Sequence, residues 1–179
     1  GPLWRWDRGN SLTLRLHGGA LSATDDMGAL AGRNLIGLLG QDGVWEIVSF
    51  RDAELIGPGE WRISRLVRGG AGTEAGAARV LPAGSQVVML DTALIPLFTS
   101  PNDLGSHGHF RLSPVNRDHA DPVAISFEAT AGSAALKPLS PVHPRARRTA
   151  QGIELSWVRR TRRDGDSWEL AEVPLAEEA

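Results

Sequence analysis

The chain of 179 residues contains no cysteine, no tyrosine and a single lysine, Lys137. The lack of cysteine excludes disulfide bonds and thiolate metal sites, and it leaves the redox compartment undetermined. No apolar run approaches the roughly 18 residues that a membrane span requires. Nineteen Lys and Arg stand against 21 Asp and Glu, for a net charge of −2, so no global basic field is present to attract nucleic acid.

Long apolar patterns with helical period are also missing. The sequence instead holds 21 glycines and 11 prolines, which fall at intervals between short apolar runs. This spacing is typical of an all-β sandwich or barrel. We therefore predict an all-β protein with a sandwich or barrel-like domain over residues 1–134, followed by a second part over residues 135–179.

The first part is centred on a predicted β-hairpin of residues 44–56 against 60–67. Val44–Phe50 is apolar on both faces, which predicts a strand covered on both sides. Glu46 is the exception and must reach a sheet edge or a charged partner. The turn Gly57-Pro58-Gly59 carries the residues of a type II turn, because proline fixes φ at the second position and glycine allows a positive φ at the third.

Residues 135–179 differ from the first part in composition and pattern. Pro138, Pro141 and Pro144 are followed by the strictly alternating strand Ile153–Trp157. A proline-rich first strand, a short turn and a strand ending in tryptophan resemble the start of a fibronectin type III domain. Such a sandwich needs about 100 residues and often a tyrosine corner, and this segment provides neither. It is either a truncated module or a pair of strands that docks on the first domain.

Two histidines form the best candidate for a metal site. On a strand, His107 and His109 would point to the same side and could share a zinc ion, with His119 and several aspartates nearby in sequence. The glycine between them and the preceding Pro101-Asn102 favour a solvated loop instead. We accordingly predict no metal and no cofactor, with His107 and His109 kept as weak candidates.

Six tryptophans bear on carbohydrate binding, because sugars stack on exposed aromatic rings. Trp45, Trp61 and Trp157 lie in alternating patterns and are predicted to be core residues. Trp4, Trp6 and Trp168 lie near chain ends or turns and are the weak candidates for a glycan-binding surface.

Two further segments are predicted to be turns. The glycine-rich stretch Arg68–Glu74 lacks the Gly-Lys-Ser/Thr of a phosphate-binding loop. Asp164-Gly165-Asp166 lacks the ligand spacing of a calcium loop. Neither a Ser-His-Asp order nor paired carboxylates stand out, so we predict no catalytic residue.

Four blocks of the sequence resemble one known family: GRNLIGLLG, VWEIVSFRDAELIGPGEWRISRLVRGGAGTE, LKPLSPVHPRARRT and IELSWVRRTRRDGDSWE. They are similar to the C-terminal portion of the large host-specificity, or baseplate, proteins of alphaproteobacterial gene transfer agents. Related tail-tip proteins occur in long-tailed phages and prophages. The matching blocks consist of strand and turn residues, so the role they imply is architectural.

The resemblance implies a non-enzymatic virion component of a phage-like tail tip or baseplate that contributes to attachment to the host cell. Its expected partners are other tail proteins, neighbouring domains of a longer parent chain and a cell-surface glycan, without nucleic acid or a membrane span. Its expected location is the distal tip of the tail of a virion-like particle, assembled in the bacterial cytoplasm and acting outside it. Two alternatives remain: a carbohydrate-binding module that recognises surface polysaccharide, and an envelope-degrading enzyme with converging carboxylates or a histidine metal site.

Overall fold

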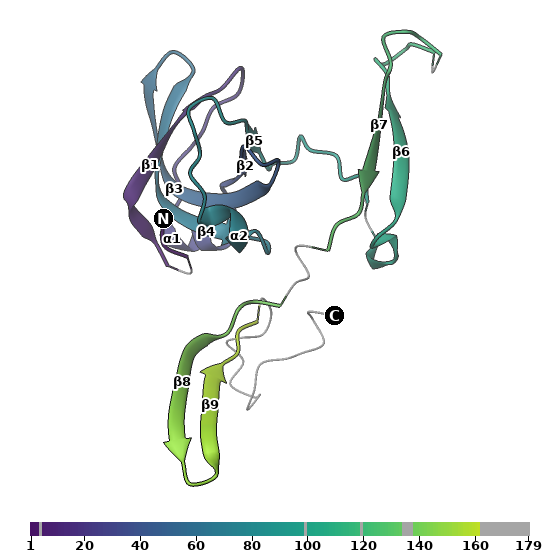
Figure 1. The fold of residues 1–179 in the computed structure, drawn as a ribbon. Helices are drawn as coiled ribbons and strands as arrows, with labels where there is room; N and C mark the ends of the chain where they lie inside the picture. The colour runs from purple at the N-terminus through teal and green to yellow at the C-terminus, as the bar shows by residue number, and fades with distance from the viewer. Residues whose placement is uncertain (4, 99, 119, 134–137, 162–179) are drawn as a thin grey trace.

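The fold consists of antiparallel β-strands with very few helical residues. The computed structural model of the chain describes residues 1–3, 5–98, 100–118, 120–133 and 138–161. Within these ranges the strands form one five-stranded sheet and two separate two-stranded hairpins (Figure 1). The helical elements are α1 (Asp26–Leu30), α2 (Glu74–Ala77) and a 3-10 turn at Pro101–Asp103. The predicted all-β class is therefore confirmed.

The five-stranded sheet has the order β1-β4-β3-β2-β5, and every neighbouring pair is antiparallel. Its strands are β1 (Asp7–Arg15), β2 (Leu35–Leu39), β3 (Trp45–Gly57), β4 (Glu60–Gly70) and β5 (Val87–Met89). The two longest strands, β3 and β4, lie next to each other near its middle and curve together (Figure 1). The β3–β4 hairpin is thus the backbone of this sheet, as the sequence predicts.

The β3–β4 turn has the predicted chemistry. Gly57 pairs with Glu60 across a loop of two residues, and Gly59 has a φ of 69°. This is the positive φ that the third position of a type II turn requires, and only glycine adopts it without steric cost. The Gly59 carbonyl also accepts a hydrogen bond from the Leu16 amide at 2.9 Å, which ties the turn to the end of β1.

One local irregularity in β1 depends on the side chain of Asp7. Between Asp7 and Ser11 the register with β4 shifts, which marks a bulge. The Asp7 carboxylate accepts hydrogen bonds from the amides of Gly9 and Asn10 inside this bulge. Asp7–Asn10 therefore has the side-chain chemistry of a turn, but the residues remain within one strand.

The core is a single cluster of buried side chains, most of them from strands β1–β4. Its fully buried members are Ile36 on β2, Val48 and Phe50 on β3, and Ile63 and Leu66 on β4. Leu14, Leu21 and Leu38 complete the cluster, and Trp61 packs against its margin.

The expectation that Val44–Phe50 is covered along its length is wrong at its start. Val44 is 41% exposed and Trp45 is 40% exposed, whereas Val48 and Phe50 are completely buried. Trp45 is consequently not a core residue, although its ring packs over Gly37 on the neighbouring strand, where an added Cβ would lie 3.2 Å from the ring. Tertiary position at the end of a strand, rather than the sequence pattern, decides this exposure.

The remaining strands form the hairpins β6–β7 (His107–Leu112 with Ile125–Thr130) and β8–β9 (Val142–Thr149 with Gly152–Val158). Each hairpin extends away from the five-stranded sheet (Figure 1), and contacts between hairpin and sheet are sparse. The β8–β9 pair agrees with the expected proline-containing first strand, short turn and second strand ending near Trp157. The fibronectin-like character and the boundary at residue 134 remain predictions, because residues 134–137 and 162–179 lie outside the described residues.

Candidate functional site

The two histidines of the metal candidate lie on a strand, and the prediction of a loop for them is wrong. β6 begins at His107, so His107 and His109 are two residues apart on one face of the β6–β7 hairpin. In the antiparallel register His107 faces Thr130 and His109 faces Glu128. Strand alternation therefore places two imidazoles, a carboxylate and a hydroxyl together.

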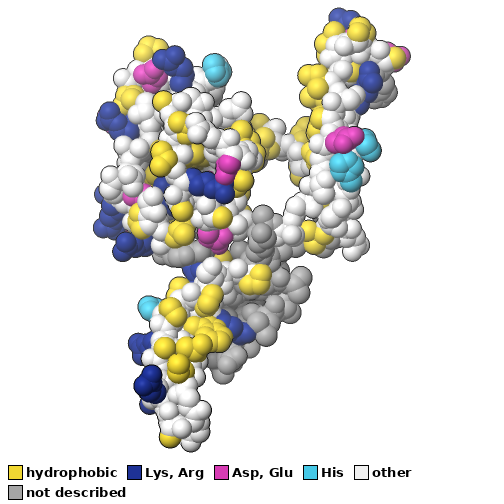
Figure 2. Space-filling view, in the orientation of Figure 1, with side chains coloured by type: hydrophobic (Ala, Val, Ile, Leu, Met, Phe, Trp, Pro, Cys, Tyr) yellow, Lys and Arg dark blue, Asp and Glu magenta, His cyan; other side chains and the backbone are white. Residues whose placement is uncertain are grey.

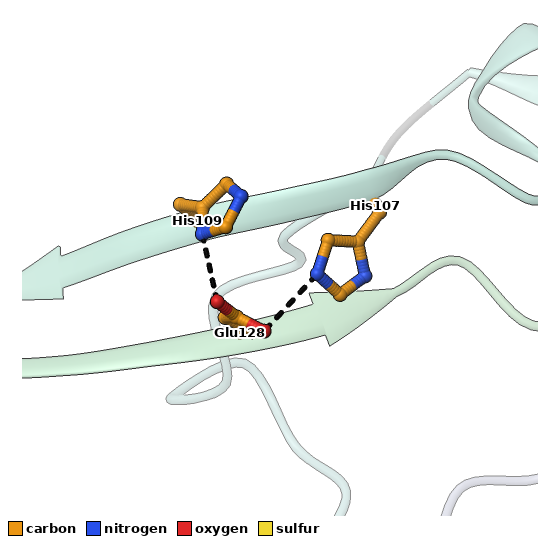
Figure 3. Close-up of side chains that lie close together, drawn as sticks. All are labelled: His107, His109 and Glu128. Atoms are coloured by element: carbon orange, nitrogen blue, oxygen red, sulfur yellow. Dashed lines mark hydrogen bonds and ion pairs between the residues drawn. The ribbon is translucent and has the colours of Figure 1, made fainter.

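The side chains converge as this register predicts (Figure 3). His107 Nε2 lies 3.2 Å from one Glu128 carboxylate oxygen, and His109 Nδ1 lies 3.0 Å from the other. The two rings meet edge to face, with centroids 5.2 Å apart. On its far side, His107 Nδ1 lies 2.9 Å from Thr130 Oγ1. One donor atom from each of His107, His109 and Glu128 falls within 4.8 Å of the others.

This cluster is open to solvent. The side chains of His107, His109 and Glu128 are 52%, 75% and 59% exposed. In the space-filling view, histidine (cyan) and acidic (magenta) side chains lie side by side on the surface of the hairpin at the right (Figure 2). An exposed group of this kind can exchange a ligand with water or with a contacting molecule, but it does not exclude water from a reaction.

The opposite face of the same hairpin is aromatic. Phe110 stacks on Phe127 with ring centroids 5.4 Å apart, and Phe98 meets Phe110 edge-on at 5.6 Å. Gly108 makes this packing possible, because an added Cβ would lie 2.6 Å from the Phe110 ring and 3.4 Å from that of Phe98. The glycine that suggests a loop in the sequence is thus required by side-chain packing in a strand.

The sequence alone identified two of the three ligand candidates. Glu128 was missed because it lies on the facing strand, and its distance from His109 depends on the β6–β7 register, which a single sequence does not reveal. His119, which the sequence places nearby, lies outside the described residues.

The tryptophans that the structure shows to be exposed are not the ones that the sequence suggests for a glycan-binding surface. Trp6 is half-buried, and Trp4 and Trp168 lie outside the described residues. Among the described residues, the exposed indoles are those of Trp45, at 40%, and of Trp157 on β9, at 55%. Trp157 borders a shallow hollow together with His143, Arg145, Ser156 and Val158. The prediction of Trp157 as a core residue is therefore wrong, and it becomes the aromatic side chain best placed to contact a ligand.

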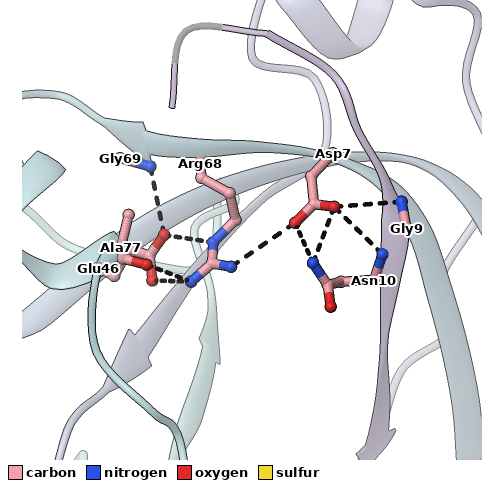
Figure 4. Close-up of polar contacts among 7 residues, drawn as sticks. All are labelled: Asp7, Gly9, Asn10, Glu46, Arg68, Gly69 and Ala77. Carbon is pink, nitrogen blue, oxygen red and sulfur yellow. Dashed lines mark hydrogen bonds and ion pairs between the residues drawn. The ribbon is translucent and has the colours of Figure 1, made fainter. Parts of the chain in front are cut away.

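A buried charge cluster of Asp7, Glu46 and Arg68 lies in the five-stranded sheet (Figure 4). Arg68 donates from Nε and from one terminal nitrogen to the two Glu46 oxygens at 2.5 and 2.7 Å. A second terminal nitrogen of Arg68 lies 3.9 Å from Asp7. The prediction that Glu46 reaches a partner is confirmed.

The hydrogen bonds of this buried charge cluster raise the pKa of Arg68 above its ordinary value. Burial opposes the rise, while the negative charges of Glu46 and Asp7 add to it. Both carboxylates also accept from the backbone, since Glu46 accepts from the Gly69 amide and Asp7 accepts from Gly9 and Asn10. The three charged side chains are buried and paired with one another within the sheet, which is the arrangement expected of a group that stabilises the fold.

Comparison with known proteins gives one partial similarity. Residues 1–88 match a family model described as Rcc01698-like, C-terminal. The matched range covers β1–β4, α1, α2 and the first two residues of β5. No curated protein matches the chain. Among the described residues, no helix is both long and apolar enough to cross a membrane. The similarity thus ends at the edge of the five-stranded sheet, and both hairpins lie beyond it.

Proposed function

We propose that this chain is a structural, non-enzymatic component of a phage-like tail tip or baseplate of the gene transfer agent type and contributes to attachment to the host cell. Its neighbours would be other tail proteins and adjoining domains of a longer parent chain. The resemblance of four sequence blocks to host-specificity proteins suggests this role. The observation that carries it is the set of apolar side chains that both hairpins leave exposed among the described residues.

The β8–β9 hairpin provides the clearest case. Ile153, Leu155 and Trp157 alternate along β9 and share one face, and they are 69%, 63% and 55% exposed. Figure 2 shows hydrophobic side chains gathered along this hairpin. A two-stranded hairpin is at best marginally stable alone in water, and contiguous exposed apolar surface marks sites of protein contact. Such a hairpin fits a protein that works within a larger assembly.

The location can be tested directly on particles. Gold-labelled antibodies against residues 1–179, applied to purified particles, are expected to label the distal end of the tail in electron micrographs. Mass spectrometry of the same preparation should detect the chain at a constant ratio to the tail proteins. Absence of the chain from particles that otherwise carry complete tails would refute the structural role.

The exposed Trp157 favours a second candidate, a carbohydrate-binding module. Its indole lies beside Arg145 and Ser156 in the shallow hollow, so a stacking surface adjoins polar groups that can bind hydroxyls. Co-sedimentation of the chain with intact recipient bacteria, and with bacteria stripped of surface polysaccharide, tests this reading. A glycan site predicts that binding is lost on stripping.

A pair of matched variants separates the two candidates. Trp157→Ala removes the ring, and Ile153→Ala removes an aliphatic side chain from the same face. Glycan stacking depends on the ring, so only Trp157→Ala should abolish co-sedimentation. Equal losses in both variants indicate an apolar protein contact. If neither variant changes binding, the β9 face takes no part in attachment.

A further inference from the structure

We propose that His107, His109 and Glu128 bind one zinc-class divalent cation across the β6–β7 hairpin, with a fourth coordination position open to water. This site is independent of the tail role proposed above and stands on its own geometry. It would join the two strands of a hairpin that makes few other contacts with the described chain.

The spacing of the donor atoms fits such an ion. Zinc bonds to histidine nitrogen and carboxylate oxygen are 2.0–2.2 Å long, so neighbouring donors in a tetrahedral site lie about 3.3 Å apart. His107 Nε2 is 3.2 Å from one Glu128 oxygen and His109 Nδ1 is 3.0 Å from the other, so each pair taken alone is already close to this value. All three donors lie within 4.8 Å of one another, so closing the site needs a shift of at most about 1.5 Å. Small rotations of exposed side chains suffice for that.

The donor types select the class of ion. Two imidazoles and one carboxylate suit zinc, cobalt, nickel and copper, whereas calcium and magnesium prefer sets of oxygen ligands alone. Three protein ligands with a fourth position free is the pattern of exchangeable zinc sites, while closed structural sites supply four. The exposure of His107, His109 and Glu128 leaves that fourth position accessible.

Thr130 supports the orientation of His107. Its hydroxyl oxygen lies 2.9 Å from His107 Nδ1, so a neutral imidazole that donates from Nδ1 to Thr130 turns the lone pair of Nε2 toward Glu128. Without an ion, the Glu128 carboxylate faces one ring nitrogen of each histidine, and each of these nitrogens must carry a proton to form a hydrogen bond with the carboxylate. A cation bound between His107, His109 and Glu128 takes the place of these protons and accepts a lone pair from each of the two nitrogens.

The aromatic side of the hairpin supports the same register. Phe110 follows His109, and its ring lies over Gly108 and stacks on Phe127, directly across from it. A slip of one residue would reverse the faces of the strand and separate His109 from Glu128. The packing that orders the aromatic face therefore also sets the ligand geometry on the opposite face.

The test is a zinc titration of the full 179-residue chain, freed of metal with a chelator, in competition with a chromophoric zinc indicator. We expect one equivalent to bind. His107→Gln, His109→Gln and Glu128→Gln should each weaken binding by more than about 10-fold, and Thr130→Val should weaken it by about 10-fold through the orientation of His107. His17→Gln, which changes an exposed histidine outside the cluster, is the matched control and should bind like the parent chain.

Two further readouts tie binding to the site. Cobalt in place of zinc should give the intense visible absorption of a four-coordinate ion, and each ligand variant should lose it. Zinc should also slow amide hydrogen exchange in β6 and β7 but not in β3 and β4. Without zinc, each ligand variant should exchange in β6 and β7 like the parent chain, which shows that its hairpin remains folded. Zinc affinity that none of the three ligand variants reduces, or that His17→Gln reduces equally, would overturn the proposal.

Discussion

Replacement of Arg68 by methionine should be among the most damaging single changes in the five-stranded sheet. Arg68 and Glu46 are 7% and 1% exposed and are joined by two charge-assisted hydrogen bonds of 2.5 and 2.7 Å. Without Arg68, the Glu46 carboxylate keeps a single described donor, the Gly69 amide at 3.3 Å. A buried charge left in this state costs about 3–5 kcal/mol of folding free energy.

The magnitude follows from the contacts. Hydrogen bonds to charged groups contribute about 1.5–3 kcal/mol each, and Arg68→Met removes two of them from Glu46. The contact with Asp7 adds little, because it is 3.9 Å long and Asp7 retains its bonds to Asn10. A loss of this size is a large part of the roughly 5–15 kcal/mol that holds a domain folded.

Urea unfolding followed by tryptophan fluorescence measures the effect as a shift in midpoint at constant slope. Arg62→Met is the matched control, since Arg62 lies on the same strand but pairs with Glu54 at 3.4 Å in solvent, with side chains 51% and 67% exposed. The control should cost less than about 1 kcal/mol. The double variant Glu46→Leu/Arg68→Met should recover most of the loss, because it leaves no buried charge at this pair.

Two outcomes would refute this reasoning. One is a cost of Arg68→Met no larger than that of the exposed control. The other is a double variant whose cost equals the sum of its single variants, since residues joined in one ion pair must show coupling. The contribution of Arg68 should also stay constant between about pH 6 and pH 10, because a raised basic pKa leaves the ion pair intact until the pH rises through that raised value.

Two smaller perturbations test local packing. Gly108→Ala should displace the Phe110 ring and weaken the β6–β7 hairpin by about 0.5–1.5 kcal/mol, measured by amide exchange in β6. Gly132→Ala is its control and should have no effect, because the added Cβ would meet nothing within 4 Å. Asp25→Ala should remove the N-terminal cap of α1, in which the Asp25 carboxylate accepts a hydrogen bond from the Gly28 amide at 2.6 Å. The expected cost is about 0.5–2 kcal/mol of folding free energy, measured by urea unfolding, and Asp25→Asn should preserve most of the stability. Equal effects in either variant and its control would contradict the corresponding contact.

The features that the sequence predicts well are those with a local physical cause. The β3–β4 hairpin is one, because Pro58 and Gly59 determine their own backbone angles. The need of Glu46 for a partner is another, because a carboxylate in an apolar strand is costly without one. The identity of that partner was not predictable, since Arg68 lies on the neighbouring strand and its approach depends on the β3–β4 register.

The errors share one physical origin. Trp45 and Trp157 lie in alternating patterns that indicate one buried face, yet both are partly exposed because nothing described covers that end of β3 or that face of β9. An alternating pattern shows which side chains share a face but not whether another element packs against it. Gly108 led to a different error. In the sequence it suggests a loop, but in the structure it lies in a strand and leaves room for the Phe110 ring.

Burial divides the described chain into two kinds of structure. The five-stranded sheet contributes most of the buried apolar cluster and neutralises its buried arginine with carboxylates from its own strands. The β8–β9 hairpin instead exposes its apolar row, and the β6–β7 hairpin exposes a cluster of metal-binding side chain types. The proposed roles in assembly and in metal binding both rest on side chains that the described part of the hairpins leaves exposed, whereas the buried charges of the sheet find their partners within it. Contacts with a cell surface, a neighbouring subunit or a metal ion should therefore map to β6–β9, and the sheet should serve as their support.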